Sequence, residues 1–373
     1  MIFFGKEMDL NYICIKKYEN DTTMDRLATN RVLLIYTGGT IGMGKNAGTG
    51  ALEPLDFRLL MDRIPELRQL DVEVDVNQFS PAIDSSDMSP QLWVKIATIV
   101  LGAYSEYDGF VILHGTDTMA YTASALSFML GNLTKPVVLT GSQLPIGQLR
   151  TDGKENLITS IELAATKQAD GRAMVPEVCI YFNGHLLRGN RATKQNADGF
   201  NAFDSFNYPH LCDAGVTFTF RSHHILQPDF HAPVTPFLSL NPNVIVFSLF
   251  PGLQENLVKH LLDAPELKGI VMRTFGSGNA PQKEWITTLL RNACERGVVV
   301  VNISQCLSGQ VAMGRYGTGY QLQDAGVISG HDSTVEAAVT KLMHLLGTYS
   351  DYKTVCELMN RSLAGEISVS ENV

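Results

Sequence analysis

Short runs of hydrophobic residues recur along the chain, and each ends in glycine or a small polar residue before a segment with helical periodicity. Seven such runs occupy residues 32–39, 110–115, 136–141, 178–184, 243–252, 269–276 and 298–304. Continuous runs of Val, Ile and Leu that alternate with helices are typical of parallel strands covered on both faces. The pattern therefore predicts an α/β fold in which a mainly parallel sheet is covered by helices. In such sheets, ligands bind beyond the carboxyl ends of the strands.

The pattern changes over residues 221–242, where four prolines and clustered histidines replace the periodicity. A chain of 373 residues exceeds the size at which a single core stops growing, about 250–300 residues. We therefore predict a larger N-terminal α/β domain over residues 31–220 and a smaller C-terminal α/β domain over 243–373, joined by a linker over 221–242. Residues 1–30 are expected to form a loosely ordered arm.

Composition and charge limit the kinds of molecule that the protein is expected to bind. The formal net charge is −9, which argues against nucleic acids and anionic membranes because both attract a basic surface. No run of about 18 apolar residues occurs, and the N-terminus lacks the apolar core of a signal peptide. The six cysteines are sparse and contain no CxxC pair, as in reducing compartments. We expect a cytoplasmic protein that acts on a small molecule.

A glycine-rich turn with the sequence YTGGTIGMGK, residues 36–45, follows the first hydrophobic run. Gly39, Gly44 and Lys45 have the spacing of a phosphate loop, but Asn46 stands where the magnesium-binding Ser or Thr is needed. The turn either serves only to connect a strand to a helix, or it lets a substrate approach the backbone and exposes Thr40 as a nucleophile.

Polar residues also follow other extended segments. Ser85 lies in DSSDM, Thr116 and Asp117 lie in GTDT, and Lys194 lies in RGNRATKQNADGFNAF. Taken singly, the first two motifs are explained as helix caps and the lysine as a surface residue. Taken together with Thr40, they supply what amide hydrolysis needs, which is a nucleophile, a base and groups that fix the substrate. A lysine removed from water has a lowered pKa and can act as the base.

At these residues the chain resembles the bacterial-type L-asparaginases, and among them the cytoplasmic type I branch. YTGGTIGM and VILHGTDTMAYTASALSFML look like the two signatures of that family, and DSSDM, RGNRATKQNADGFNAF, GNAPQ and VNISQC extend the similarity. The resemblance implies hydrolysis of L-asparagine to aspartate and ammonia without a metal or an organic cofactor. It also implies a homotetramer, built as a dimer of dimers, with active sites between subunits.

The resemblance further implies a role for each candidate residue. Thr40 would be the primary nucleophile, and Thr116, Asp117 and Lys194 would form a second catalytic group. Ser85 would bind the α-carboxylate of the substrate and Asp117 its α-ammonium, beside Thr116. Family members usually carry a tyrosine on the loop after the first signature, whereas residues 44–54 contain none. Thr40 is therefore expected to be activated by another residue, or by the substrate together with Lys194.

Two segments of the C-terminal half, residues 272–282 and 302–314, again place polar groups after hydrophobic runs. They either pack the domain and contact another subunit, or bind a ligand. In the type I branch the corresponding segments form a second asparagine site that regulates activity. Arg273 would bind a carboxylate there, with Ser304 and Cys306 nearby. Cys306 is expected to be a small packing residue, because no histidine lies near it in sequence to lower its thiol pKa.

Two functions of other classes stay open. The site could bind asparagine without hydrolysing it, as in a sensor, or the turn at Gly39 to Lys45 could belong to a nucleotide hydrolase. The sequence also leaves open the preference between asparagine and glutamine, because one methylene in a pocket is worth only about 1–3 kcal/mol.

Overall fold

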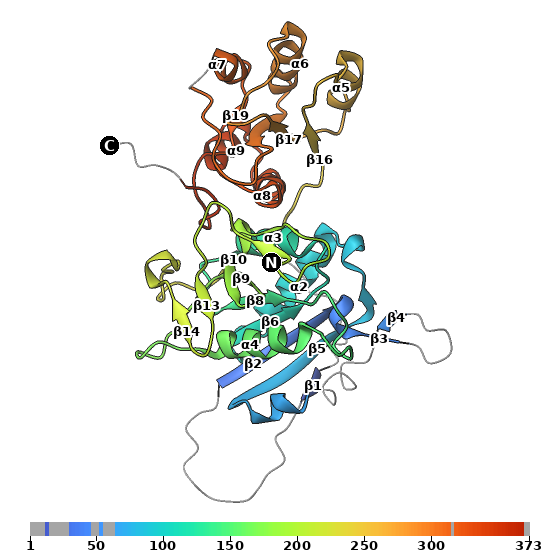
Figure 1. Ribbon diagram of the computed structural model, residues 1–373. Helices are drawn as coiled ribbons and strands as arrows, with labels where there is room; N and C mark the ends of the chain where they lie inside the picture. Colours follow the sequence, from blue (N-terminus) through green and yellow to red (C-terminus); the bar gives the residue numbers. More distant parts are fainter. Residues whose placement is uncertain (1–11, 15–29, 46–51, 55–63, 315–316, 369–373) are drawn as a thin grey trace, which may run out of the picture.

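The computed structural model describes residues 12–14, 30–45, 52–54, 64–314 and 317–368. These residues form a larger N-terminal part and a smaller C-terminal part, each built around its own sheet (Figure 1). None of the described helices is long and apolar enough to cross a membrane.

The nine-stranded sheet of the N-terminal part has the order β1-β5-β2-β6-β8-β9-β10-β13-β14. Its strands are β1 (Tyr12–Cys14), β2 (Asn30–Gly38), β5 (Val72–Ile83), β6 (Gly109–Leu113), β8 (Val137–Thr140), β9 (Val178–Phe182), β10 (His185–Arg188), β13 (Cys212–Ala214) and β14 (Phe218–Phe220). The central strands from β5 to β9 are parallel, whereas β1, β10, β13 and β14 pair antiparallel at the two edges. The carboxyl ends of these five parallel strands therefore lie at the same edge of the sheet.

Helices cover both faces of this sheet. On one face, α2 (Pro90–Gly102) and α3 (Met119–Met129) contribute to a core that includes Trp93, Ile96 and Leu126. On the other face, α4 (Gly153–Ala165) packs Leu157 and Ile161 against the strands. Because both faces are buried, every residue of β6 and β8 is buried, which explains why these strands read as continuous hydrophobic runs.

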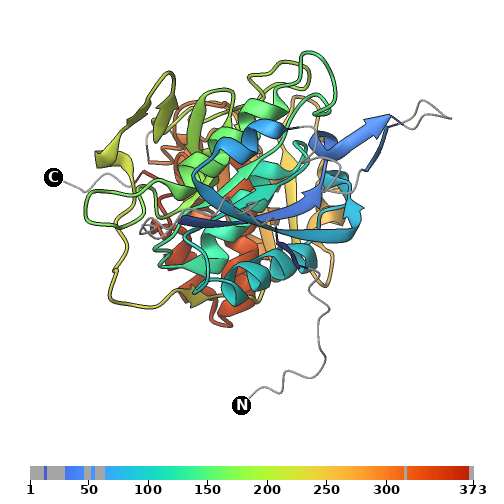
Figure 2. The ribbon, with the colours of Figure 1, turned by 90° about the horizontal axis from the view of Figure 1, so that it is seen from below.

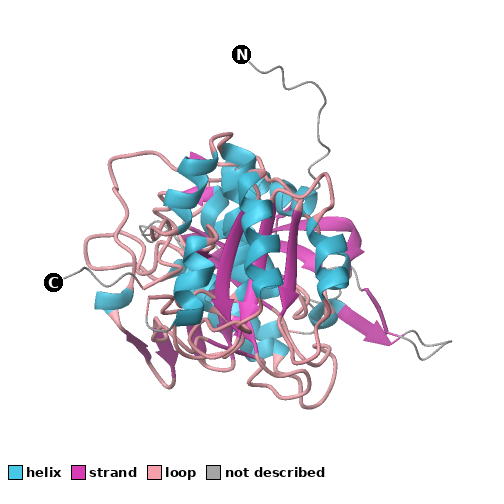
Figure 3. Cartoon of the chain, turned by 90° about the horizontal axis from the view of Figure 1, so that it is seen from above, coloured by secondary structure: helices cyan, strands magenta, loops and turns pink. Residues whose placement is uncertain are grey.

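The C-terminal part has a four-stranded parallel sheet with the order β16-β17-β18-β19. Its elements are β16 (Val244–Ser248), α5 (Glu255–Leu262), β17 (Gly269–Thr274), α6 (Glu284–Glu295), β18 (Val299–Ser304), α7 (Gly317–Asp324), β19 (Ile328–Ser329), α8 (Val335–Thr348) and α9 (Tyr352–Met359). The helices α5, α6 and α7 share one apolar core with the sheet, and α8 and α9 share another. Figure 3 shows helices on both sides of these strands.

Short elements complete the fold. They are η1 (Thr40–Gly42), β3 (Met43–Lys45), β4 (Leu52–Pro54), η2 (Pro65–Gln69), η3 (Ser85–Asp87), β7 (Leu130–Gly131), η4 (Gly189–Arg191), β11 (Thr193–Lys194), β12 (Phe203–Asp204), η5 (Ser222–His224) and β15 (Thr235–Pro236). The hairpin of β3 and β4 projects outward from the rest of the molecule (Figures 1 and 2).

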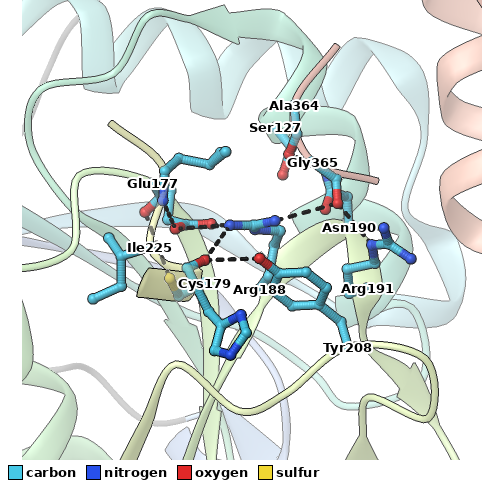
Figure 4. Close-up of polar contacts among 12 residues, drawn as sticks. Ser127, Glu177, Cys179, Arg188, Asn190, Arg191, Tyr208, Ile225, Ala364 and Gly365 are labelled. Carbon is cyan, nitrogen blue, oxygen red and sulfur yellow. Dashed lines mark hydrogen bonds and ion pairs between the residues drawn. The ribbon is translucent and has the colours of Figure 1, made fainter. Parts of the chain in front are cut away.

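Two buried arginines, Arg188 and Arg191, join the two parts next to β11. Arg188 donates a hydrogen bond from Nε to Glu177 at 2.6 Å, and both side chains are buried. Figure 4 shows Arg188 and Arg191 converging on the carbonyl oxygen of Gly365, which accepts from Arg191 Nε at 2.7 Å. Arg191 also pairs with the buried Asp332, at 2.9 Å. The chain just before Lys194 is therefore anchored to the C-terminal part.

The sequence prediction of an α/β fold with a mainly parallel sheet is confirmed, and each of the seven hydrophobic runs contains a strand of one of the two sheets. The antiparallel strands β10, β13 and β14 were not predicted from the hydrophobic pattern, because all three are short and β13 and β14 are only partly buried. Within the N-terminal segment, Tyr12–Cys14 pair with β5, so this part of the expected arm belongs to the sheet. The rest of residues 1–29 lies outside the described residues.

Candidate active site

Three strand ends meet where glycines allow their backbones to touch. A Cβ atom on Gly39 would lie 2.5 Å from the backbone nitrogen of Gly115, and one on Gly115 would lie 2.4 Å from the hydroxyl oxygen of Ser85. Real Cβ atoms do not approach other atoms this closely, so only glycine fits at either position. The glycines thus bring together the segments that carry Thr40, Ser85 and Thr116, as expected for the carboxyl ends of β2, β5 and β6.

Thr40 begins the single turn η1 directly after β2, and its side chain is half-buried. Gly39 precedes it with a positive φ of 92°, which turns the chain away from the sheet. No hydrogen bond joins the Thr40 hydroxyl to another residue in the described part of the chain. A hydroxyl on such a turn is free to react with a substrate.

The turn does not form a phosphate loop. A phosphate loop leads from a strand into a helix whose N-terminus holds the phosphates. Here η1 is followed by β3, and Lys45 pairs with Leu52 in the β3–β4 hairpin. The structural basis for a nucleotide hydrolase is therefore missing, and Asn46 and the remainder of the loop to residue 51 lie outside the described residues.

Lys194, Thr116 and Asp117 form one polar group. The amine nitrogen of Lys194 lies 2.8 Å from the hydroxyl oxygen of Thr116 and 2.7 Å from Oδ1 of Asp117. Thr116 is 8% exposed and the Lys194 side chain 19%, whereas the Asp117 side chain is 65% exposed. The amine and the hydroxyl are thus largely removed from water, while the carboxylate has oxygen surface left for a ligand.

Neither Thr116 nor Asp117 caps helix α3. The N-cap residue is Thr118, and no side chain makes a capping hydrogen bond there. The Thr118 hydroxyl instead donates to the backbone oxygen of Ser85 at 2.6 Å, which ties the DSSDM segment to GTDT. The interpretation of Thr116 or Asp117 as the helix cap is therefore wrong, because the N-cap position falls on Thr118.

The DSSDM segment is likewise no cap for α2. Asp84 caps the short helix η3 by accepting from the backbone nitrogen of Ser86, and α2 begins after Ser89 without a side-chain cap. Ser85 is 4% exposed and lies against Gly115. Its hydroxyl thus lies beside the GTDT segment, the position expected for a group that binds the substrate.

Gln143 also belongs to this cluster, although no sequence motif pointed to it. It follows β8 in the loop after Thr140, and its side-chain oxygen accepts a hydrogen bond from the Thr116 hydroxyl at 3.3 Å. Its side-chain nitrogen donates to the backbone oxygens of Ala197 and Gly199, at 3.0 and 3.1 Å. Gln143 therefore joins Thr116 to the loop after Lys194. Its position after a hydrophobic run was the only signal in the sequence.

His114 supports the GTDT segment from inside the protein. Its side chain is fully buried, and burial lowers its pKa from 6.5 to about 4, so the ring is neutral at neutral pH. Nδ1 lies 2.7 Å from the oxygen of Gly115, and Nε2 lies 2.9 Å from the hydroxyl of Thr122, which accepts from Trp93. Because a neutral imidazole has one donor and one acceptor, both of its nitrogens are satisfied in place.

An open cleft of about 1110 Å³ lies beside the polar group. Residues from the loops after β2, β8 and β11 line it, including Met43, Gln143, Gln148, Ala197 and Phe200. The cleft shares Gln143 with the Thr116 cluster, so a small molecule has access to this end of the sheet.

The C-terminal candidates lie at the ends of neighbouring strands, as their sequence pattern suggests. Arg273 is on β17 and Ser304 on β18, and the Ser304 hydroxyl donates to the oxygen of Gly276 at 2.6 Å. Cys306 is exposed, so the expectation that it packs inside a pocket is not met in this chain. Arg273 Nε is buried without a hydrogen-bond partner in the described structure, as is Oε2 of Glu336 on α8.

A direct contact connects that region with the neighbour of Lys194. Thr193, the neighbour of Lys194 in β11, donates to Oε1 of Glu336 at 2.7 Å. Glu336 is 6% exposed, and burial raises its pKa above the ordinary value although Thr193 and other donors oppose the shift. The strand that carries Lys194 is thus bound to a buried acid of the C-terminal part.

Comparison with known protein families agrees with this architecture. The model of the N-terminal domain of asparaginases matches residues 31–226, and the model of the C-terminal domain of glutaminases and asparaginases matches residues 243–359. Together the matches cover most of the chain. The protein therefore belongs to the asparaginase family.

Individual relatives span nearly the whole chain. L-asparaginase 1 of Escherichia coli K12 is 42% identical over 349 residues, which cover 90% of this chain and 98% of the relative. The crystal structure of L-asparaginase I from Vibrio cholerae superposes with a TM-score of 0.83 at 40% identity, covering 92% of this chain and all of that one. The 60 kDa lysophospholipase of Mus musculus is 40% identical over 367 residues, which cover 91% of this chain and 63% of the relative.

Proposed function

We propose that this protein is an L-asparaginase, an amidohydrolase that converts L-asparagine to aspartate and ammonia. The observation that carries the proposal is the contact of Lys194 with Thr116 and Asp117 at the strand ends that also hold Thr40 and Ser85. Membership of the asparaginase family and the 42% identity to an L-asparaginase support the same activity.

In the proposed reaction, the Thr40 oxygen attacks the side-chain carbonyl carbon of asparagine. The Thr40 proton leaves as the new C–O bond forms, and the amide nitrogen takes up a proton and departs as ammonia. An ester between Thr40 and the aspartyl group remains, and a water molecule cleaves it to give aspartate and to restore the threonine hydroxyl.

Lys194 and Thr116 act as the proton relay in this scheme. The 2.8 Å contact lets a neutral Lys194 amine accept a proton from the Thr116 hydroxyl, which takes one in turn from the nucleophile or the water. The low exposure of both groups favours this role, because it keeps bulk water away from the relay. Asp117 holds the amine in place at 2.7 Å.

Ser85 and Asp117 are the proposed substrate anchors. The hydroxyl of Ser85 would donate to the α-carboxylate, and the solvent-exposed carboxylate of Asp117 would pair with the α-ammonium. The two groups lie on segments held together by the hydrogen bond from Thr118 to Ser85. An amino acid fixed at both of its charged groups would present its side-chain amide in one direction.

We further propose that asparagine activates the enzyme at a second site in the C-terminal part. The support is the pair of buried polar atoms without partners, Arg273 Nε and Glu336 Oε2, which suit the carboxylate and the ammonium of an amino acid. Because Thr193 binds Glu336, a ligand there would act on the strand that carries Lys194.

The proposed working form is a cytoplasmic homotetramer, a dimer of dimers without a cofactor. Leu149, at the rim of the cleft, is fully exposed in one chain, and Asp117 is also open to solvent, as expected if a neighbouring subunit completes the site. Sedimentation under assay conditions tests this assembly, because a fully active monomer would contradict it.

Ammonia release by the purified protein tests the activity. Asparagine should give stoichiometric ammonia and aspartate, and glutamine measured in parallel gives the amide preference. A protein that binds asparagine without releasing ammonia would be a sensor instead, and the proposal would fail. A lysophospholipid serves as a control substrate of another chemical class, because one relative is named a lysophospholipase.

A further inference from the structure

Two histidines and an aspartate meet at the edge of the large sheet, away from the catalytic residues. His185 begins β10 and pairs directly with Asp213 on the antiparallel strand β13, while His210 lies just before β13. Nδ1 of His185 lies 3.0 Å from Oδ1 of Asp213, and Nδ1 of His210 lies 3.4 Å from the same oxygen. Three potential ligand atoms thus converge within 4.8 Å of one another.

We infer that His185, His210 and Asp213 bind a divalent transition-metal ion such as Zn²⁺. Two imidazoles and one carboxylate are a ligand set that such ions favour. Metal–ligand bonds of about 2.0–2.1 Å in tetrahedral geometry place ligand atoms about 3.3 Å apart. The separations of Asp213 from the two histidines, 3.0 and 3.4 Å, already match this value, and all three ligand atoms lie within 4.8 Å of one another.

A contact between His210 and Asp204 supports this assignment. The other ring nitrogen of His210, Nε2, lies 2.9 Å from Oδ1 of Asp204. A histidine that binds a metal usually donates its second N–H to a carboxylate, which fixes the ring and its tautomer. Asp204 therefore turns Nδ1 of His210 toward His185 and Asp213.

The two oxygens of Asp213 have different partners. Arg221 occupies Oδ2 at 2.5 Å and leaves Oδ1 to the histidines. Oδ1 is therefore the oxygen that faces both ring nitrogens, at 3.0 and 3.4 Å.

The scaffold holds the ligands in place before an ion arrives. The turn at Asn183 and Gly184, both with positive φ, sets the register of β10. The backbone nitrogen of Leu211 donates to Leu186 at 2.7 Å, which fixes the loop that carries His210. The side chains of His185, His210 and Asp213 are 44%, 24% and 36% exposed, so the ion has access and keeps a position for water.

An ion at this site would hold the segment between β12 and β13 against β10. Asp204 is in β12, which pairs with β11, and Thr193 lies directly opposite Asp204. The site therefore stabilises the segment beside Lys194 without touching the substrate. It is independent of the catalytic proposal and requires no metal in the reaction.

Titration of the metal-free full-length protein with Co²⁺, followed by its visible absorption and by displacement with Zn²⁺, tests the site. One Co²⁺ per chain should bind with nitrogen and oxygen ligands, and His185→Gln and His210→Gln should each weaken binding at least tenfold. Asp204→Asn should weaken it about tenfold, the low end for loss of a supporting carboxylate. His260→Gln, an exposed histidine of α5 outside the cluster, is the matched control and should bind like wild type.

Equal Co²⁺ affinity in wild type, His185→Gln and His210→Gln would overturn the proposal, as would a thiolate absorption band that assigns the ion to a cysteine. If a variant fails to fold by circular dichroism, anomalous diffraction from Co²⁺-loaded wild-type crystals decides the question. An anomalous peak between the three side chains supports the site. If Co²⁺ occupies another position fully and no peak lies between these side chains, the proposal is refuted.

Discussion

The amine nitrogen of Lys194 lies 2.8 Å from the hydroxyl oxygen of Thr116, although 78 positions separate the two residues in the chain. Three features produce this contact. Gly39 and Gly115 allow the strand ends to touch, Gln143 holds the Thr116 hydroxyl, and Thr193 binds Glu336 beside Lys194. The proton relay of the proposed reaction depends on this geometry.

Replacing Lys194 with arginine separates the role of base from that of charge. Arginine keeps the positive charge beside Asp117 but cannot give up its proton in a protein. Loss of a general base typically costs about 10²–10⁴ in rate. We expect Lys194→Arg to fold with a melting temperature near that of wild type and to lose at least about a hundredfold in kcat. Retention of most activity would show that the lysine serves only as a charge.

Replacing Thr116 with valine removes the hydroxyl and keeps the shape. Because Thr118 and not Thr116 is the N-cap residue of α3, the loss of about 1 kcal/mol expected for a removed cap should not occur. We expect kcat to fall at least about a hundredfold while thermal unfolding stays near wild type. Thr98→Val, which removes a hydroxyl bonded within α2, is the control and should keep full activity. Reduced stability with normal turnover would show that the Thr116 hydroxyl has a structural role instead.

Replacing Arg273 with alanine tests regulation. If asparagine binds beside Arg273 and Glu336 and favours the active state, the rate should rise sigmoidally with asparagine concentration. Arg273→Ala should then raise the concentration needed for activation, because the carboxylate partner is lost. Arg291→Ala, a surface arginine paired with Asp324, is the matched control. A hyperbolic curve that the Arg273 variant leaves unchanged would contradict the second site.

The buried His114 should make stability depend on pH. Its pKa is lowered by burial from 6.5 to about 4, so the unfolded chain binds its proton at a higher pH than the folded one. The contribution of His114 is complete above about pH 6.5 and is lost progressively as the pH falls to about 4, an effect of about 3 kcal/mol. Denaturant titrations of wild type and His114→Gln should show a shallower decline in the variant. His344, with its pKa also lowered to about 4 by burial, supplies part of the remaining slope.

An unchanged decline of the free energy of unfolding in His114→Gln would show that His114 is not held neutral. The comparison concerns the slope between pH 6.5 and 4 alone, because the variant also loses the hydrogen bond with Thr122 and is expected to be less stable at every pH.

The sequence predicted the features that local patterns determine. Strands buried on both faces must be apolar throughout, so β2, β6 and β8 were evident as hydrophobic runs. Thr40, Ser85 and Thr116 could be placed because each follows such a strand or an extended segment. Their proximity then followed from the geometry of a parallel sheet.

Contacts between distant and irregular segments could not be predicted in this way. Gln143 reaches Thr116 from a loop, and Thr193 meets Glu336 across 143 positions. The ligands of the proposed metal site come from antiparallel pairing of short edge strands, and their sequence spacing matches no known metal motif. Only the register of β10 and β13 brings His185 to Asp213.

The central claim is that Thr40 attacks the substrate, and turnover by Thr40→Ala tests it most directly. The variant removes one hydroxyl from a turn in which no described residue hydrogen bonds to it, so folding should be unaffected. We predict that ammonia release from asparagine falls to background while calorimetry still shows aspartate binding, because Ser85 and Asp117 remain. Near-normal ammonia release by the folded variant would contradict the assignment of Thr40 as the nucleophile.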